Sequence, residues 1–243
     1  ALARLIEARS VITSQMSADD LRRSITEPAR VANLRIEEGL VKRILIEVQG
    51  EGAALPLLQF ALSQLYHRRT AQNVLTVEAY ESVGGLRDAL ALHAESIYGR
   101  MSERQQTIMR RLMLELVAPS EHDEFARARR DRSMLAFESV SDGEIQTVID
   151  YLAASGNRLL TLSRDDRGVI WVEVSHEALL NRWFRCRDWI SANRQNIADR
   201  AVFEDEAQRW LAAGRDRSYL RSGARLSEAQ GWLARGGEFV SAA

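Results

Sequence analysis

Apolar residues recur every three or four positions along the first hundred residues, which is the spacing of one helix face. One stripe runs through residues 37–48, and another runs through residues 54–66 with a proline near its start. A pair of glycines at 84–85 separates these from a further helical pattern over residues 86–98. Only three prolines occur in the chain, which favours long helices over sheets. We therefore predict a helical bundle over residues 17–100.

The middle of the chain has further helix signals. A capping box at residues 102–105 predicts a helix that ends near residue 117. A second box at residues 141–144 opens a helix that ends at residue 154. The arginine-rich stretch between them, residues 127–132, is interpreted as helix or loop.

Two β-strands are expected after these helices. Residues 158–162 and 169–174 are rich in apolar and β-branched side chains, and they flank a turn that contains Asp and Gly. Three helices followed by a hairpin is the order of a winged helix. The predicted fold is mainly α and has three parts: a helical bundle over residues 1–100, a winged-helix domain with one small β-hairpin over residues 101–187, and a C-terminal helical segment over residues 188–243.

A short repeat lies in the last segment. The sequence around Trp210 recurs around Trp232, 22 residues later. Two copies can begin a helical solenoid. Two similar amphipathic helices with no repeat architecture give the same pattern.

Composition limits the classes of function. The 243 residues are 46% hydrophobic and 28% charged, carry a formal net charge of −1 and include a single cysteine. No apolar run approaches the roughly 20 residues of a membrane helix, and no signal-peptide pattern begins the chain. We therefore expect a cytoplasmic protein without membrane contact. The chain begins at Ala1 in the middle of a pattern, which suggests a piece of a larger protein.

No catalytic constellation is found in the sequence. A P-loop needs a lysine that reaches the nucleotide phosphates, and the only lysine, Lys42, lies in the unrelated stretch GLVKR. The serines lack a Gly-x-Ser-x-Gly elbow, and Cys186 has no reactive signature around it. We therefore expect that this chain is not an enzyme in its own right.

The stretch SHEALL at residues 175–180 holds a candidate anion site. If Ser175 caps the following helix, His176 lies in the first turn, where free backbone N–H groups and the helix dipole favour an anion. The functional interpretation is a phosphate contact by His176. The alternative is a histidine that only packs where the wing meets the helix.

Pro56 is the second candidate. It suits the first turn of a helix, where its missing N–H costs nothing. The functional interpretation of Leu55-Pro56-Leu57 is a rigid turn that packs against a purine ring. The alternative is an ordinary helix start with a core stripe.

The residues do not favour DNA recognition by the expected winged helix. The candidate recognition helix carries Asp142, Glu144 and Asp150, which repel duplex phosphate. The basic residues gather at 127–132, where Asp131 interrupts them and a solvated face explains them. Nucleic acid is therefore not an expected partner.

The order of these motifs resembles the region after the P-loop core in bacterial "novel STAND" NTPases, which are AAA+-related signalling ATPases often joined to WD or TPR repeats. The matching residues run along nearly the whole chain: SITEPA (24–29), LPLLQFAL (55–62), GGL (84–86), NRLL (157–160), SHEALL (175–180), and Trp210, Gly223, Leu226 and Trp232.

The resemblance implies roles for both candidates. Such switches bind ADP or ATP, with Mg, mostly through the P-loop core, and a helical lid and a winged helix close over the nucleotide. Pro56 is implied to lie near adenine, although Ala54 stands where related proteins often have glycine. His176 is implied to contact the ADP phosphates and to hold the off state.

The resemblance also implies partners: a P-loop core upstream, a sensor or repeat domain downstream, and further copies of the protein on activation. This chain is then the regulatory lid of the switch. Two other functions stay open. One is a winged-helix nucleic-acid-binding regulator that uses Arg129 and Arg130, and the other is a helical interaction scaffold built on Trp210 and Trp232.

Overall fold

The computed structural model describes residues 16–49, 54–120 and 125–235. The chain divides into two compact units, unit 1 (residues 1–87) and unit 2 (residues 88–243), and each is described by itself. Both units are mainly helical, as predicted. Among the described residues, no helix is long and apolar enough to cross a membrane.

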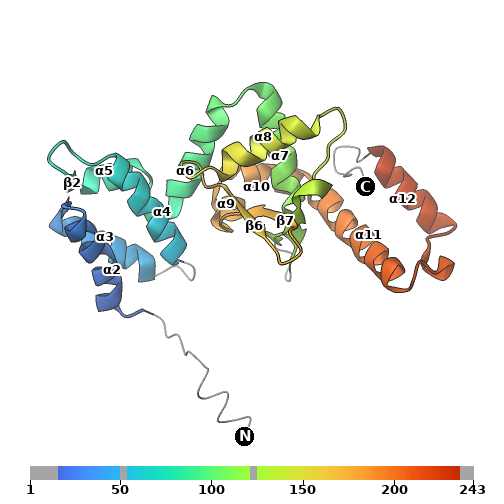
Figure 1. The fold of residues 1–243 in the computed structure, drawn as a ribbon, viewed down its shortest axis with the longest axis horizontal. Helices are drawn as coiled ribbons and strands as arrows, with labels where there is room; N and C mark the ends of the chain where they lie inside the picture. Colours follow the sequence, from blue (N-terminus) through green and yellow to red (C-terminus); the bar gives the residue numbers. More distant parts are fainter. Residues whose placement is uncertain (1–15, 50–53, 121–124, 236–243) are drawn as a thin grey trace, which may run out of the picture. The chain divides into compact units, whose positions relative to one another are not determined.

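Unit 1 consists of short helices and one pair of two-residue strands (Figure 1). Its elements are α2 (Ala18–Val31), β1 (Arg35–Ile36), α3 (Glu38–Gln49), α4 (Ala54–His67), β2 (Val74–Leu75), α5 (Val77–Ser82) and the start of α6 (Gly85–Arg100). β1 and β2 pair in parallel, with Arg35 opposite Val74. Strands this short leave no alternation in the sequence, so the pattern did not predict them.

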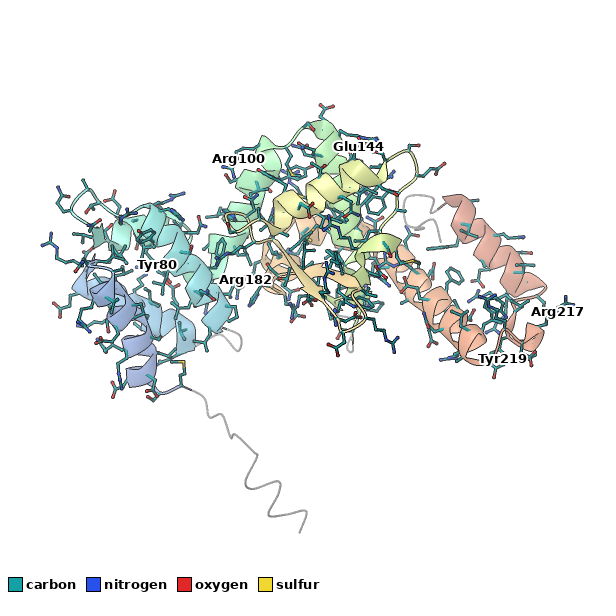
Figure 2. All side chains as sticks on the ribbon, viewed as in Figure 1. Tyr80, Arg100, Glu144, Arg182, Arg217 and Tyr219 are labelled. Carbon is teal, nitrogen blue, oxygen red and sulfur yellow. The ribbon has the colours of Figure 1, made fainter. Side chains whose placement is uncertain are left out.

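The turn before α6 depends on a carboxylate from α3. Gly84 and Gly85 have φ angles of +90° and +62°, which glycine adopts without steric cost. Glu47 Oε2 accepts the backbone N–H of Leu86 at 3.0 Å and the hydroxyl of Tyr80 at 2.8 Å. Tyr80 lies in the interior of the unit (Figure 2), and burial together with Glu47 raises the pKa of its hydroxyl. Glu47 therefore caps the first turn of α6 in place of a local side chain.

α6 begins in unit 1 and ends in unit 2. The other elements of unit 2 are α7 (Glu103–Glu115), β3 (Val117–Pro119), β4 (Phe125–Arg127), β5 (Arg130–Asp131), η2 (Arg132–Met134), α8 (Asp142–Ala153), β6 (Leu160–Arg164), β7 (Ile170–Val174), α9 (Ala178–Arg182), α10 (Phe184–Ala192), α11 (Arg194–Ala212), η3 (Arg217–Tyr219) and α12 (Ala224–Arg235). The domain limits expected at residues 100 and 187 stay a prediction.

Unit 2 contains more β-structure than the sequence predicted. β6 and β7 form the expected hairpin, and β5 pairs with the other edge of β7 to give the order β5-β7-β6. β3 and β4 form a second antiparallel pair. The prediction of a single hairpin is therefore wrong. The stretch 127–132, predicted as helix or loop, is so only in part: it contains the end of β4, residues 128–129 outside any element, β5 and the start of η2. β5 pairs with a strand from a distant part of the chain, and tertiary pairing of this kind overrides local pattern.

A buried ion pair joins α11 to the end of α7. Arg200 lies with its Nη1 3.0 Å from Glu115 Oε1, and both side chains are buried. Arg200 Nη2 also donates to the carbonyl oxygens of Leu114 at 3.1 Å and Val117 at 2.7 Å. Burial raises the pKa of the Glu115 carboxyl, an effect that the charge of Arg200 partly offsets. The guanidinium therefore satisfies a carboxylate and two carbonyl groups that water does not reach.

α11 and α12, which carry the repeated tryptophans, form a helical hairpin (Figure 1). Trp210 is half-buried. Trp232 is only 7% exposed and lies with its ring centroid 4.8 Å from that of Phe203. Arg221 Nη2 donates to Glu206 Oε1 at 2.9 Å and ties the loop of the hairpin to α11. Trp232 therefore stabilises the hairpin and is not displayed on its surface.

Two glycine-to-alanine variants test the turn before α6, one in the turn and one as a control later in the same helix. Gly85→Ala should lower the free energy of unfolding by about 1–2 kcal/mol, because alanine is strained at a positive φ, and its Cβ would lie 3.0 Å from Glu47 Oε2. Gly99→Ala should raise it by about 0.5–1 kcal/mol, since nothing lies within 4 Å of the added Cβ. Urea unfolding followed by circular dichroism measures both, and equal effects would contradict this account of the turn.

Replacement of Arg200 should be far more costly than replacement of an exposed arginine on the same helix. Arg200→Met leaves Glu115 and the carbonyl groups buried without their partner, and should destabilise the chain by about 3–5 kcal/mol. Arg209 pairs with Asp205 on the surface of α11, so Arg209→Met should cost less than about 1 kcal/mol. The measurement is urea unfolding followed by tryptophan fluorescence. Two variants of similar stability would show that the buried pair does not hold α11.

Candidate functional site

His176 lies between the end of β7 and the start of α9. The backbone N–H of Ser175 donates to the carbonyl of Leu159 at 3.0 Å, which continues the pairing of β7 with the strand beside it. α9 begins only at Ala178, and Glu177 in the N-cap position makes no side-chain bond to the helix. The prediction that Ser175 caps this helix is therefore wrong, because the sheet pairing extends through Ser175.

The side chain of His176 takes over part of the capping role. Its Nδ1 accepts the backbone N–H of Ala178 at 3.0 Å. A neutral imidazole has one acceptor and one donor nitrogen, so this bond assigns the proton of the neutral ring to Nε2. The ring is half-buried. The residue therefore presents a defined N–H donor at the end of the sheet.

A carboxylate from α6 fixes the C-terminal end of the segment formed by residues 175–183. Trp183 separates α9 from α10, with a ψ angle of 105°. Its indole N–H donates to Glu95 Oε2 at 2.7 Å, and Arg185 Nε donates to the same oxygen at 3.1 Å. The bond from Arg185 lowers the pKa of the Glu95 carboxyl, and the bond from Trp183 adds to this effect. Sequence analysis missed Glu95, because about ninety residues separate it from its partners.

An aromatic cluster surrounds this carboxylate. The ring of Trp183 lies 5.3 Å from that of Trp189 and 6.2 Å from that of Tyr98. Edge-to-face arrangements at these distances are favourable. Trp183 is also one of the largest fully buried side chains of the described residues. The break between α9 and α10 is therefore a packed feature of the core.

Pro56 lies in the first turn of α4, as predicted. Leu57 and Leu58 of the same turn are buried in unit 1, whereas Pro56 is exposed and Leu55 is 48% exposed. The turn therefore has a core face and an exposed apolar face. The stretch Gly50-Glu51-Gly52, whose glycines predict a break before this helix, lies outside the described residues.

The structure defines the surroundings of the two candidates separately, because Pro56 belongs to unit 1 and His176 to unit 2. Among the described residues, no group of three or more His, Cys, Asp or Glu could hold a metal ion. Cys186 is buried, and burial raises the pKa of its thiol to about 12. It therefore stays a neutral thiol at physiological pH.

The four arginines of residues 127–132 form bonds within the protein. Their partners come from other elements: Arg127 donates to the Val174 carbonyl (3.1 Å), Arg129 to the Ser163 hydroxyl (3.1 Å) and Arg130 to the Glu204 carboxylate (2.9 Å), and Arg132 pairs with Asp150 (2.9 Å). These contacts give each of the four side chains a partner within the protein. They argue against the stretch as a binding patch for phosphate backbones.

The charge on α8 also disfavours duplex DNA. Glu144 closes the predicted capping box with Ser141 and accepts a bond from Arg104 Nε at 3.0 Å. The bond from Arg104 lowers the pKa of Glu144 to about 2, with a further contribution from Ser141. The carboxylate is therefore charged at neutral pH on the helix that would have to enter the groove.

The chain should show no salt-dependent affinity for duplex DNA at micromolar concentration. Fluorescence anisotropy of a labelled duplex should be equally flat with the wild-type chain and with the Arg129→Gln/Arg130→Gln variant, because both arginines already have partners. A shift that weakens steeply with salt and disappears in the double variant would contradict this expectation.

Comparison with known proteins gives one match. The family model for Novel STAND NTPase 1 matches residues 1–218, a stretch that includes Pro56 and His176. No curated protein and no solved structure matches the chain. Since the family match covers most of the 243 residues, the chain belongs to the novel STAND NTPase family.

Proposed function

We propose that this chain is the regulatory lid of a nucleotide-dependent signalling switch, and that it closes over ADP or ATP bound to a P-loop core outside this chain. The observation that carries the proposal is the bond from the Ala178 N–H to His176 Nδ1. It makes Nε2–H the donor of the neutral ring, and a donor suits a phosphate oxygen.

The fold of unit 2 supports a winged-helix interpretation of residues 101–187. α7 and α8 pack together, the hairpin β6-β7 follows α8 as a wing, and β5, which lies between α7 and α8 in the sequence, completes the three-stranded sheet. His176 lies two residues after the end of β7, the last strand of this sheet. In this interpretation the segment that follows the wing carries the phosphate contact, and acidic α8 takes no part in DNA binding.

Unit 1 supplies a surface that fits an adenine base. Leu55 and Pro56 are exposed beside buried neighbours on α4. An exposed proline in the first helical turn is rigid, so it loses little entropy when a flat ring packs on it. The P-loop core would supply the phosphate-binding lysine and the Mg ligands.

The switch requires that nucleotide binds one conformation better than the other. We propose that ADP favours the closed form through His176, and that exchange for ATP or engagement of a sensor releases unit 2 and allows copies of the protein to assemble. Coupling of this kind is typically about 1–3 kcal/mol. The family is an NTPase family, and hydrolysis or exchange would take place on the core.

A helical interaction surface is the second candidate function. Large apolar side chains of the α11–α12 hairpin are 43–54% exposed: Leu211, Tyr219, Leu220, Leu226 and Leu233. This exposed set, rather than Trp232, would carry the contact. Binding of a protein partner through this face with no dependence on ADP or on His176 would favour the second candidate.

His176→Ala should release ADP from the intact protein that carries the P-loop core. Loss of a hydrogen bond to phosphate removes about 1.5–3 kcal/mol from the closed state, so ADP should dissociate about 10- to 150-fold faster. The measurement is the content and off-rate of co-purified ADP, and His67→Ala at the far end of α4 is the control. An unchanged off-rate in His176→Ala would exclude the phosphate contact.

A further inference from the structure

A guanidinium from β4 holds the backbone immediately before His176. Arg127 Nη1 donates to the carbonyl oxygen of Val174 at 3.1 Å and to that of Ser175 at 3.4 Å. Within the described residues, the acidic side chain paired with it is Glu173, 4.0 Å away, at the limit of an ion pair. The main bonds of Arg127 therefore go to two consecutive peptide groups and not to a carboxylate.

We propose that Arg127 is the positioning residue of His176, a role that rests on the proposed phosphate contact of that histidine. Ser175 is held from both sides, since its N–H donates to Leu159 and its carbonyl accepts from Arg127. These two bonds fix the peptide that leads into His176. The ring of His176 follows this peptide and accepts the Ala178 N–H at Nδ1, which leaves Nε2–H as the donor of the neutral ring.

This external support matters because the segment cannot position itself. α9 has five residues, its N-cap residue Glu177 makes no side-chain bond to the helix, and isolated helices of this length are not stable in water. The carbonyl oxygens of His176 and Glu177 accept the N–H groups of Leu179 at 3.0 Å and Leu180 at 2.9 Å, whereas those of Val174 and Ser175 accept bonds from Arg127. A charged donor on two carbonyl groups is stronger than a neutral one, so Arg127 is suited to hold the segment.

Arg129 offers a matched control. It lies two residues away and also bonds a neighbouring strand, with Nη2 donating to Ser163 Oγ at 3.1 Å and the guanidinium 4.7 Å from the Trp171 ring centre. In the described part of the chain, its bonds go to Ser163 and its ring contact to Trp171, and not to residues 174–176. Arg127→Gln and Arg129→Gln therefore remove the same charge from the same region, and only the first removes the support of His176.

The first test is the tautomer of His176 in the 243-residue chain, read from the ¹⁵N shifts of its ring nitrogens. The wild-type and Arg129→Gln rings should show Nε2 protonated and Nδ1 as acceptor. In Arg127→Gln the two shifts should move toward each other, because the Nδ1 bond weakens and both tautomers become populated. Unchanged shifts in a folded Arg127→Gln chain would overturn the proposal.

Arg127→Lys keeps the test decisive if the glutamine variant does not fold. A lysine ammonium can bond the same carbonyl groups but has a shorter reach, so the two shifts should move part of the way. Wild-type shifts in the lysine variant would be a rescue by a second charged donor and would support the proposal, and the double-mutant cycle below supplies the outcome that overturns it.

The second test is a double-mutant cycle on the intact nucleotide-binding protein. Arg127→Gln should speed ADP dissociation about 2- to 10-fold, and it should have no further effect in the His176→Ala background. Additive effects would mean that Arg127 acts independently of His176 and would overturn the proposal. No effect of His176→Ala alone would instead reject the proposed function, and the tautomer of His176 would still decide the role of Arg127.

Discussion

Residues 175–183 are held in place from outside, and the proposed function depends on this constraint. A helix of five residues has too few hydrogen bonds to fix its own position. Arg127 bonds the peptide groups before α9, and Glu95 accepts the indole N–H of Trp183 after α9. Within the helix, the side chains of Leu179 and Leu180 are buried. The segment therefore has a defined position at both ends, which a hydrogen bond to phosphate requires.

Polar contacts connect helices of unit 2 to one another, whereas apolar side chains fill its core. The Arg200 and Glu115 pair attaches α11 to α7, and Glu95 attaches α10 through Arg185. Polar bonds can be exchanged for bonds to water at a modest net free energy. Polar contacts between helices are therefore consistent with a switch whose segments separate and reassociate. Such a switch also requires a ligand that binds one of its two states better.

Local signals predicted much of the fold, and long-range contacts account for what they missed. The capping boxes at Ser102 and Ser141 are both present, because the bonds that define them lie within four residues. Ser175 looked like a similar cap, but its N–H pairs with Leu159. Arg127 and Glu95 could not be predicted, since their partners lie some fifty and ninety residues away. The sequence pattern identified Pro56 and His176 as candidates, and the family resemblance implied their roles toward the nucleotide.

The most direct test of this account is a structure of the intact protein with ADP bound. The account predicts that His176 keeps Nδ1 on the Ala178 N–H and places Nε2 within hydrogen-bonding distance of a phosphate oxygen, with the nucleotide held by the P-loop core. ADP bound in the core of a closed protein, with the His176 ring out of reach of every phosphate oxygen, would contradict it.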